Sequence, residues 1–261
     1  MIAGGLDEFN INIDTSYILE VYFDGTTVSK IEYKDVPNVP HSFYDATFGS
    51  YQGRSVIISG DGSNGQCIEF DQEEYQVIPS LNVNRFCAAS TFIQNNVVVA
   101  GGFKGGRFLD SRLDSILDGN KSLDSIEILD WDESNHGSQW NISPLKMPIK
   151  VRDHTLFTFN DKLLMIGGLD DSYNELDTIW EGSFDKLSNN ISWVEMGLRL
   201  QKKRYGHFSF VISNKIITFG GFRLDGEDFV EIIENNTLKQ GPKIPFELNT
   251  LYDQGKLLNQ S

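Results

Sequence analysis

The chain has 261 residues, 39% hydrophobic and 12% aromatic, and its formal net charge is −15 at pH 7. This composition is too apolar for a disordered chain, and the acidic balance argues against binding to nucleic-acid phosphates, which requires a basic face. The longest apolar runs, such as 97–100, are far shorter than the roughly 20 residues that cross a bilayer, and no signal-type segment follows Met1. We therefore expect a soluble, cytoplasmic protein with neither a nucleic-acid partner nor membrane insertion.

The cysteines and the Asn-x-Ser/Thr sequences bear on the cellular compartment. Cys67 and Cys87 are too few for a disulfide framework and lack metal-ligand spacing, so we interpret them as buried apolar residues. The Asn-x-Ser/Thr sequences leave a secreted, glycosylated protein as an alternative. They begin at Asn120, Asn141, Asn190, Asn235 and Asn259.

One pattern of two apolar runs and a glycine pair recurs along the chain. In its clearest copy, 204–221, a polar turn at Ser213 and Asn214 separates two runs rich in β-branched and aromatic residues, which predicts a β-hairpin. Further copies occupy 84–102 and 150–168. In all three copies the interval to the first glycine is thirteen positions, counted from Ala88, His154 and His207. The sequence therefore predicts a repeat protein.

The glycine pairs, or a close variant, recur at intervals of 56, 41, 66 and 53 residues. A glycine lets a strand end in a sharp turn with positive φ and lets a neighbouring backbone approach closely. We therefore expect these glycines to be structural: Gly4, Gly5, Gly60, Gly101, Gly102, Gly167, Gly168, Gly220 and Gly221.

A third strand is predicted after each glycine pair, and in four repeats it places a Glu between two apolar residues. These segments are 19–21, 68–70, 126–128 and 230–232, and Trp180 stands where the Glu of the fourth repeat would fall. Carboxylates at repeated positions resemble a metal or acid–base site. We expect them instead to pair with the arginines of the repeats, because chemistry repeated in stacked units usually serves packing.

The repeat resembles the kelch repeat, which forms one four-stranded blade of a β-propeller. The resemblance rests on the glycine pairs and on Arg85, Arg204, His154, His207, Trp140 and Trp193, with Arg152 one place out of step. It implies an all-β, kelch-type β-propeller in which residues 1–261 form a single domain of about five four-stranded blades. The expected repeats are 1–40, 41–83, 84–149, 150–203 and 204–248, and 249–261 would add a partial strand.

The two ends of the chain suggest how the ring closes. Residues 249–258 resemble 154–164 with one residue deleted, whereas the first repeat begins at a strand that is expected to be the second of its blade. Pairing of the C-terminal strand with the N-terminal strands would complete a split blade and remove exposed sheet edges. The alternative is a fragment of a longer ring, such as a six-bladed one.

The predicted binding residues lie on the propeller face that carries the long loops, because loops on a rigid scaffold usually carry binding. Residues 103–124 contain a helical stripe formed by Leu109, Leu113, Ile116 and Leu117. Its simplest interpretation is packing on a blade edge, and the alternatives are a partner-docking element or a lid over the central channel. Basic residues precede the fourth and fifth repeats, and acidic loops are expected to face them. The partner-binding candidates are Arg107, Leu109, Leu113, Leu117, Lys150, Arg152, Tyr173, Lys202, Lys203 and Arg223.

The sequence contains no nucleophile motif, phosphate-binding loop or metal-ligand spacing. We therefore predict no catalytic residue, no metal and no cofactor. The predicted function is a protein–protein interaction module or scaffold that binds a peptide or protein through its loop face. The alternative is a sugar-acting enzyme similar to the mutarotase or galactose oxidase propellers, with its site at the central channel.

Overall fold

The structure is a computed structural model of the chain. It describes residues 2–3, 14–24, 27–40, 45–51, 54–60, 65–71, 73–104, 121–131, 139–221 and 229–243. All regular elements within these ranges are β-strands, and no helix in them is long and apolar enough to cross a membrane.

Four of the sheets are four-stranded antiparallel blades, each ordered from its first strand to its last. The β4–β7 blade contains β4 (Thr47–Tyr51), β5 (Arg54–Ile58), β6 (Cys67–Phe70) and β7 (Tyr75–Ile78). The β8–β13 blade contains β8 (Ala89–Ile93), β9 (Asn96–Ala100), β12 (Ile126–Asp130) and β13 (Asn141–Ile142). The β15–β19 blade contains β15 (Thr155–Phe159), β16 (Lys162–Ile166), β18 (Thr178–Asp185) and β19 (Asn190–Arg199). The β20–β23 blade contains β20 (Phe208–Ile212), β21 (Lys215–Phe219), β22 (Phe229–Glu234) and β23 (Thr237–Lys243).

The remaining strands form one three-stranded sheet and two short ribbons. The sheet joins β1 (Ile2–Ala3), β2 (Ser16–Asp24) and β3 (Thr27–Asp35). One ribbon pairs β10 (Phe103–Lys104) with β11 (Lys121–Ser122), and the other pairs β14 (Val151–Arg152) with β17 (Leu169–Asp170).

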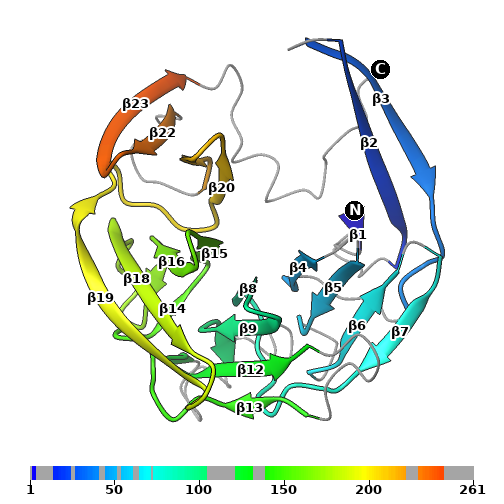
Figure 1. The fold of residues 1–261 in the computed structure, drawn as a ribbon, viewed down its shortest axis with the longest axis horizontal. Coiled ribbons are helices and arrows are strands. Elements are labelled where there is room, and N and C mark those ends of the chain that lie inside the picture. Colours follow the sequence, from blue (N-terminus) through cyan, green and yellow to red (C-terminus); the bar gives the residue numbers. More distant parts are fainter. Residues whose placement is uncertain are drawn as a thin grey trace.

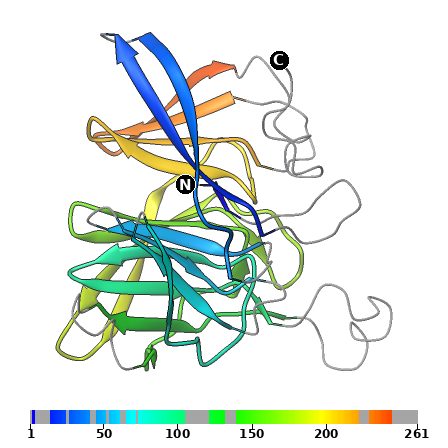
Figure 2. The ribbon, with the colours of Figure 1, turned by 90° about the vertical axis from the view of Figure 1, so that its right-hand side faces the viewer.

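The sheets stand around a common centre, with the β2–β3 hairpin and the β20–β23 blade at the two ends of the described arc (Figure 1). The first strands β4, β8, β15 and β20 are innermost, and each contacts the next around the arc. Figure 2 shows the same arrangement from the side, where the β2–β3 hairpin extends beyond the blades. The core consists of apolar clusters between adjacent blades, such as the one that joins Ala89, Val98 and Ile126 to Leu163 and Met165.

The hairpin turns have the backbone that the sequence predicts. Both residues of the Asn160–Asp161 and Ser213–Asn214 turns have φ between 48° and 61°. Asn, Asp and Ser tolerate this left-handed region, and turns of this kind follow the right-handed twist of the strands they join.

The glycine pairs are the joints between blades. The second glycine donates its backbone N–H to a main-chain oxygen in the next blade, from Gly102 to Val151 (2.9 Å) and from Gly168 to Arg204 (2.9 Å). A Cβ atom on Gly101 would lie 2.5 Å from the Val151 oxygen, and its φ is +64°. A side chain at this position would therefore separate two blades.

A second set of joints, which the sequence analysis did not predict, links the entries to the innermost strands. The N–H of Cys87 donates to the Asp45 oxygen (3.0 Å), that of Asp153 to the Cys87 oxygen (2.9 Å), and that of Gly206 to the Asp153 oxygen (2.7 Å). All four residues have φ between 52° and 60°. Each of the four blades thus enters its first strand through a left-handed residue at an equivalent position, and in the last three blades this residue is hydrogen-bonded to its equivalent in the preceding blade.

The predicted all-β propeller fold is confirmed by these sheets. The predicted equivalence of the four glutamates is wrong for Glu20 and Glu69. Tyr17, not Glu20, lies opposite Ile2 on β1. Glu127 lies opposite Val99, whereas in the β4–β7 blade the corresponding residue, opposite Ile57, is Ile68 rather than Glu69. Glu69 is one residue farther along its strand, and a shift of one residue reverses the face of the sheet. Gly4, Gly5 and residues 249–261 lie outside the described residues, so the closure of the ring and the extent of the single domain stay predictions.

Candidate partner-binding surface

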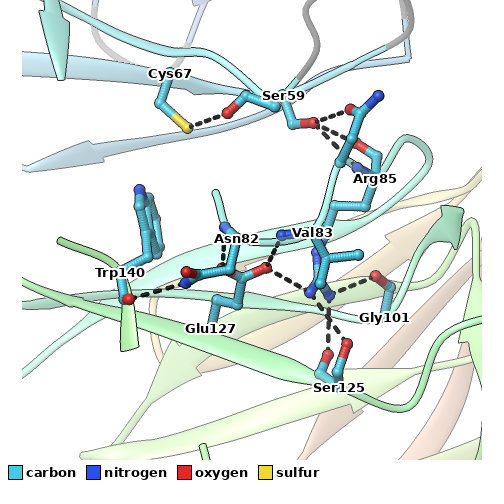
Figure 3. A network of polar contacts seen from close by, with 11 residues as sticks. Ser59, Cys67, Asn82, Val83, Arg85, Gly101, Ser125, Glu127 and Trp140 are labelled. Carbon is cyan, nitrogen blue, oxygen red and sulfur yellow. Dashed lines mark hydrogen bonds and ion pairs between the residues drawn. The ribbon is translucent and has the colours of Figure 1, made fainter. Parts of the chain in front are cut away.

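The Arg85–Glu127 pair is the centre of a buried polar network (Figure 3). Both side chains are fully buried, and the Arg85 Nη2–Glu127 Oε1 distance is 2.7 Å. Glu127 also accepts hydrogen bonds from the backbone N–H groups of Asn82 (2.7 Å) and Val83 (3.1 Å). Arg85 donates to the main-chain oxygens of Gly101 and Ser125, both at 2.9 Å. Burial lowers the pKa of Arg85, and Glu127 acts in the opposite direction.

The β20–β23 blade repeats this arrangement. Arg204 Nη2 lies 2.6 Å from Glu231 Oε1, Arg204 Nη1 donates to the Gly220 oxygen at 3.0 Å, and the Gln201 N–H donates to Glu231. The arginine in each case precedes the first strand and the glutamate stands on the third, as expected from the sequence. Both carboxylates are committed to structural partners, which leaves no free acid–base group at these positions.

The β15–β19 blade replaces the pair with apolar residues. Trp180 lies opposite Met165 on β16, the position that Glu127 and Glu231 occupy in their blades. Val151 stands three residues before His154, as Arg204 stands before His207, and it is fully buried. Val151 and Trp180 belong to one apolar cluster. Arg152, one residue after the position of the repeat arginine, therefore has no glutamate partner on the third strand and makes different contacts on the loop face.

Arg152 lies between two aromatic rings. Its guanidinium carbon is 5.0 Å from the centroid of Phe103 and 4.6 Å from that of Tyr173, within the range of a cation–π interaction. Arg152 Nη1 donates to the Ser122 hydroxyl at 2.6 Å. We call Phe103, Arg152 and Tyr173 the Tyr173 platform. Arg152 was predicted to be a surface contact for a partner, but it is only 8% exposed. Its role is therefore to hold the exposed ring of Tyr173 in place.

A compact loop holds Tyr173 in place. The Asp170 carboxylate accepts hydrogen bonds from the N–H groups of Ser172 and Asn174, both at 2.8 Å, and the Tyr173 N–H donates to the Asp170 oxygen. Desolvation raises the pKa of Asp170, but the hydrogen bonds from Asn174 and Ser172 together outweigh it, so the pKa is lowered from its ordinary value. Tyr173 has φ +62° and is 67% exposed. A bulky residue in this conformation is uncommon and occurs where the surrounding structure imposes it.

The basic residues around the platform are balanced by acidic ones. Lys150 Nζ lies 3.6 Å from Asp171, whose other oxygen accepts the Ser122 N–H at 2.8 Å. Lys203 is exposed and Lys202 is half-buried. The surface at Lys150 therefore has mixed charge, with an acidic loop facing the basic residue as the sequence predicts. The remaining partner-binding candidates lie outside the described residues: Arg107, Leu109, Leu113, Leu117 and Arg223.

The two repeat histidines pack between blades. His154 lies against Gly101 and His207 against Gly167, where a Cβ atom would come within 2.8 Å of each ring. Burial lowers the pKa of both imidazoles to about 3, and Arg204 contributes at His207.

The two repeat tryptophans differ in burial. Trp140 is buried and donates to the Pro79 oxygen (2.7 Å), whereas Trp193 is half-buried.

Hydroxyl groups connect the innermost strands around the centre. Thr47 bonds Ser90 (2.9 Å) and Thr155 bonds Ser209 (2.9 Å), each across a pair of adjacent blades. Within the described ranges, no cluster of three or more His, Cys, Asp and Glu side chains could hold a metal ion. These hydroxyls thus serve the contacts between blades.

Comparison with known proteins agrees with this architecture. No family profile matches the chain. An F-box/kelch-repeat protein of Arabidopsis thaliana is 32% identical over 81 residues, which are 31% of this chain and only 17% of the relative's length. The solved structure of YjhT superposes with a TM-score of 0.63 at 14% identity, covering 80% of this chain and 68% of the other. The chain folds as a β-propeller. The sequence match supports the resemblance to kelch repeats, and the structural match shows the fold alone.

Proposed function

We propose that this propeller is a protein-interaction module that binds a peptide or protein partner through the loop face around the Tyr173 platform. The observation that carries the proposal is the exposed Tyr173 ring, held in a left-handed conformation on a buried arginine. Tyr and Arg are enriched among the residues that dominate binding energy at protein interfaces. A ring that is already fixed loses little conformational entropy when a partner covers it.

The charged residues around the platform suit a selective contact. Lys150 and Asp171 form an ion pair near the rim, and Lys203 is exposed. Charges at the rim of an interface set orientation and association rate more than affinity. We therefore assign the main contact to Tyr173 and a steering role to Lys202 and Lys203.

Affinity purification with matched variants tests the proposal. Tyr173→Ala removes an exposed ring, so we expect it to weaken partner binding at least about tenfold while the melting temperature stays within about 2 °C. Leu187→Ala is the control, because Leu187 is fully exposed in the β18–β19 turn. A Tyr173→Ala protein that retains its partners at the wild-type level overturns the proposal.

The cytoplasmic location expected from the sequence belongs to the same proposal. Asn141 and Asn235 are exposed and stand in Asn-x-Ser/Thr sequences. We expect both to be unmodified in protein from its native source, as intact-mass measurement would show. Glycans on them would favour the secreted alternative.

A further inference from the structure

A groove opens between the β15–β19 and β20–β23 blades, on the face that carries the hairpin turns. Its volume is about 270 Å³. Leu164, Ile216 and Ile233, which belong to the apolar cluster between these two blades, form its floor. The turn residues Asn160 and Asn214 stand at its rim. The groove thus lies on the opposite face from the loop face and shares no residue with the Tyr173 platform.

The junction that contains the groove lacks the tryptophan found in two other junctions. In the β15–β19 blade, Trp193 lies opposite Gly182, two residues beyond Trp180 on the third strand, and packs into the junction with the β8–β13 blade. The equivalent of Gly182 in the β20–β23 blade is Ile233, two residues beyond Glu231, and its partner is Leu238. Leu238 packs into the junction that contains the groove. Trp140 fills the corresponding place one junction earlier. Two junctions therefore hold an indole where the third holds the smaller leucine.

The polar groups of the groove suit a peptide with a positive charge. Asn160, Asn214, Asn235 and Asn236 line it, and carboxamides can both donate to and accept from a peptide main chain. Lys162 lines it too, and its ammonium donates to the Ser183 hydroxyl (2.7 Å). Glu181 lines it without an ion pair or hydrogen bond to any described residue. A carboxylate that no described residue pairs, beside an apolar floor, favours a cationic group at that point of the groove, as does the net charge of −15.

We propose that this groove binds a peptide segment in which a large aromatic side chain stands next to a basic residue. The aromatic ring enters the space that the repeat indole fills in the other two junctions. The basic side chain pairs with Glu181, and the asparagines bind the peptide backbone. This surface gives the propeller a second docking site, on the face opposite the one assigned to its main partner.

Titration with short capped peptides, followed by NMR, tests the proposal. The probe Gly-Trp-Lys-Gly is expected to shift the resonances of Asn160, Asn214 and Asn236. Gly-Ala-Lys-Gly should bind at least about tenfold more weakly, since truncation of a buried aromatic anchor has effects of this size. Gly-Trp-Glu-Gly should also bind more weakly than the probe.

Two variants separate the aromatic part from the charged part. Leu238→Trp fills the groove from within and should abolish probe binding, whereas Glu181→Gln should remove the preference for the Lys peptide over the Glu peptide. Tyr173→Ala should leave probe binding unchanged, which distinguishes this site from the loop face. The proposal is overturned by a wild-type protein that shows no shifts at millimolar probe, by shifts confined to the loop face, or by an unchanged preference in Glu181→Gln. If Leu238→Trp does not fold, the peptide series and Glu181→Gln decide the question.

Discussion

The β8–β13 and β20–β23 blades are built on a buried arginine–glutamate pair, whereas the β15–β19 blade between them has Val151 and Trp180 in the same places. The backbone is the same in all three: the first strand is entered through Cys87, Asp153 or Gly206, each in a left-handed conformation. The three blades therefore share one backbone geometry, and the arginine and the glutamate at a blade centre are either both present or both replaced by apolar residues. A lone buried charge is costly, so neither partner can be replaced by itself. The exchange also moves an arginine to position 152, where it supports Tyr173.

The largest effect is expected from breaking one ion pair. Arg85→Met leaves the Glu127 carboxylate buried without its cation and should cost about 3–5 kcal/mol in the free energy of unfolding. Arg85→Met combined with Glu127→Leu should cost less than the sum of the two single variants, because the blade then resembles its apolar neighbour. Urea unfolding of the four proteins measures this coupling. Strictly additive losses would show that the two residues do not act as a unit.

A somewhat smaller effect is expected at the glycine joints, which all blades share. Gly168 has φ +104°, and a Cβ there would lie 2.5 Å from Val151 Cγ2 and 2.8 Å from the Arg152 oxygen. Gly168→Ala should therefore cost more than about 2 kcal/mol. A Cβ on Gly197 in β19 would have no atom within 4 Å, so Gly197→Ala should change stability by less than about 0.5 kcal/mol. Equal melting temperatures for the two variants would contradict the assignment of Gly168 to a joint.

Acid should weaken the junctions that contain histidine. The pKa values of His154 and His207 are lowered to about 3, so between about pH 6.5 and pH 3 the unfolded chain binds protons that the folded chain does not. Burial of the neutral imidazoles therefore contributes fully to stability above the unfolded pKa of about 6.5. As the pH decreases below it, each histidine lowers the free energy of unfolding by up to about 1.4 kcal/mol per pH unit.

Ala88 shows which substitution tests this effect, because it occupies the histidine position in the β8–β13 blade. His154→Ala should lower stability at pH 7 and reduce the loss on going from pH 6 to pH 5. Urea unfolding at both pH values gives the two slopes. An unchanged slope would show that His154 does not contribute to the acid sensitivity.

The smallest effect is expected at the entry to the innermost strand. Gly206 has φ +60°, where its equivalents are Cys87 and Asp153. Gly206→Ala should therefore cost about 1 kcal/mol, the usual penalty for a side chain in this region. Thermal unfolding measures it, and a loss as large as that of Gly168→Ala would mean that more than backbone conformation is involved.

The sequence predicts the repeated parts of this molecule well and the exchanged parts poorly. Glycine pairs, turn residues and alternating apolar runs are local signals, and they give the hairpins and the propeller. The pairing of Arg85 and Arg204 with third-strand glutamates also follows from the repeat. Glu69 was misplaced because a Glu between two apolar residues has the same pattern in either register.

The candidate site depends on contacts between segments far apart in the chain. Tyr173, Arg152 and Phe103 are brought together by three different elements, so spacing alone indicates neither the stacking nor the burial of Arg152. One signal was available: Arg152 stands one place out of step with the other repeat arginines, as expected of a residue that does not form the buried pair with a third-strand glutamate. The conformation of Cys87 and Asp153 also had a signal, since both align with Gly206.

Photo-crosslinking at position 173 tests the loop-face binding site most directly. Benzoylphenylalanine in place of Tyr173 keeps an aromatic ring on Arg152, and the same group in place of Val194, which is 69% exposed on β19, serves as the control. With a partner recovered by affinity purification, we predict a crosslinked complex from position 173 and none from position 194. A complex that still forms but crosslinks only from position 194, or equally from both, would contradict the account.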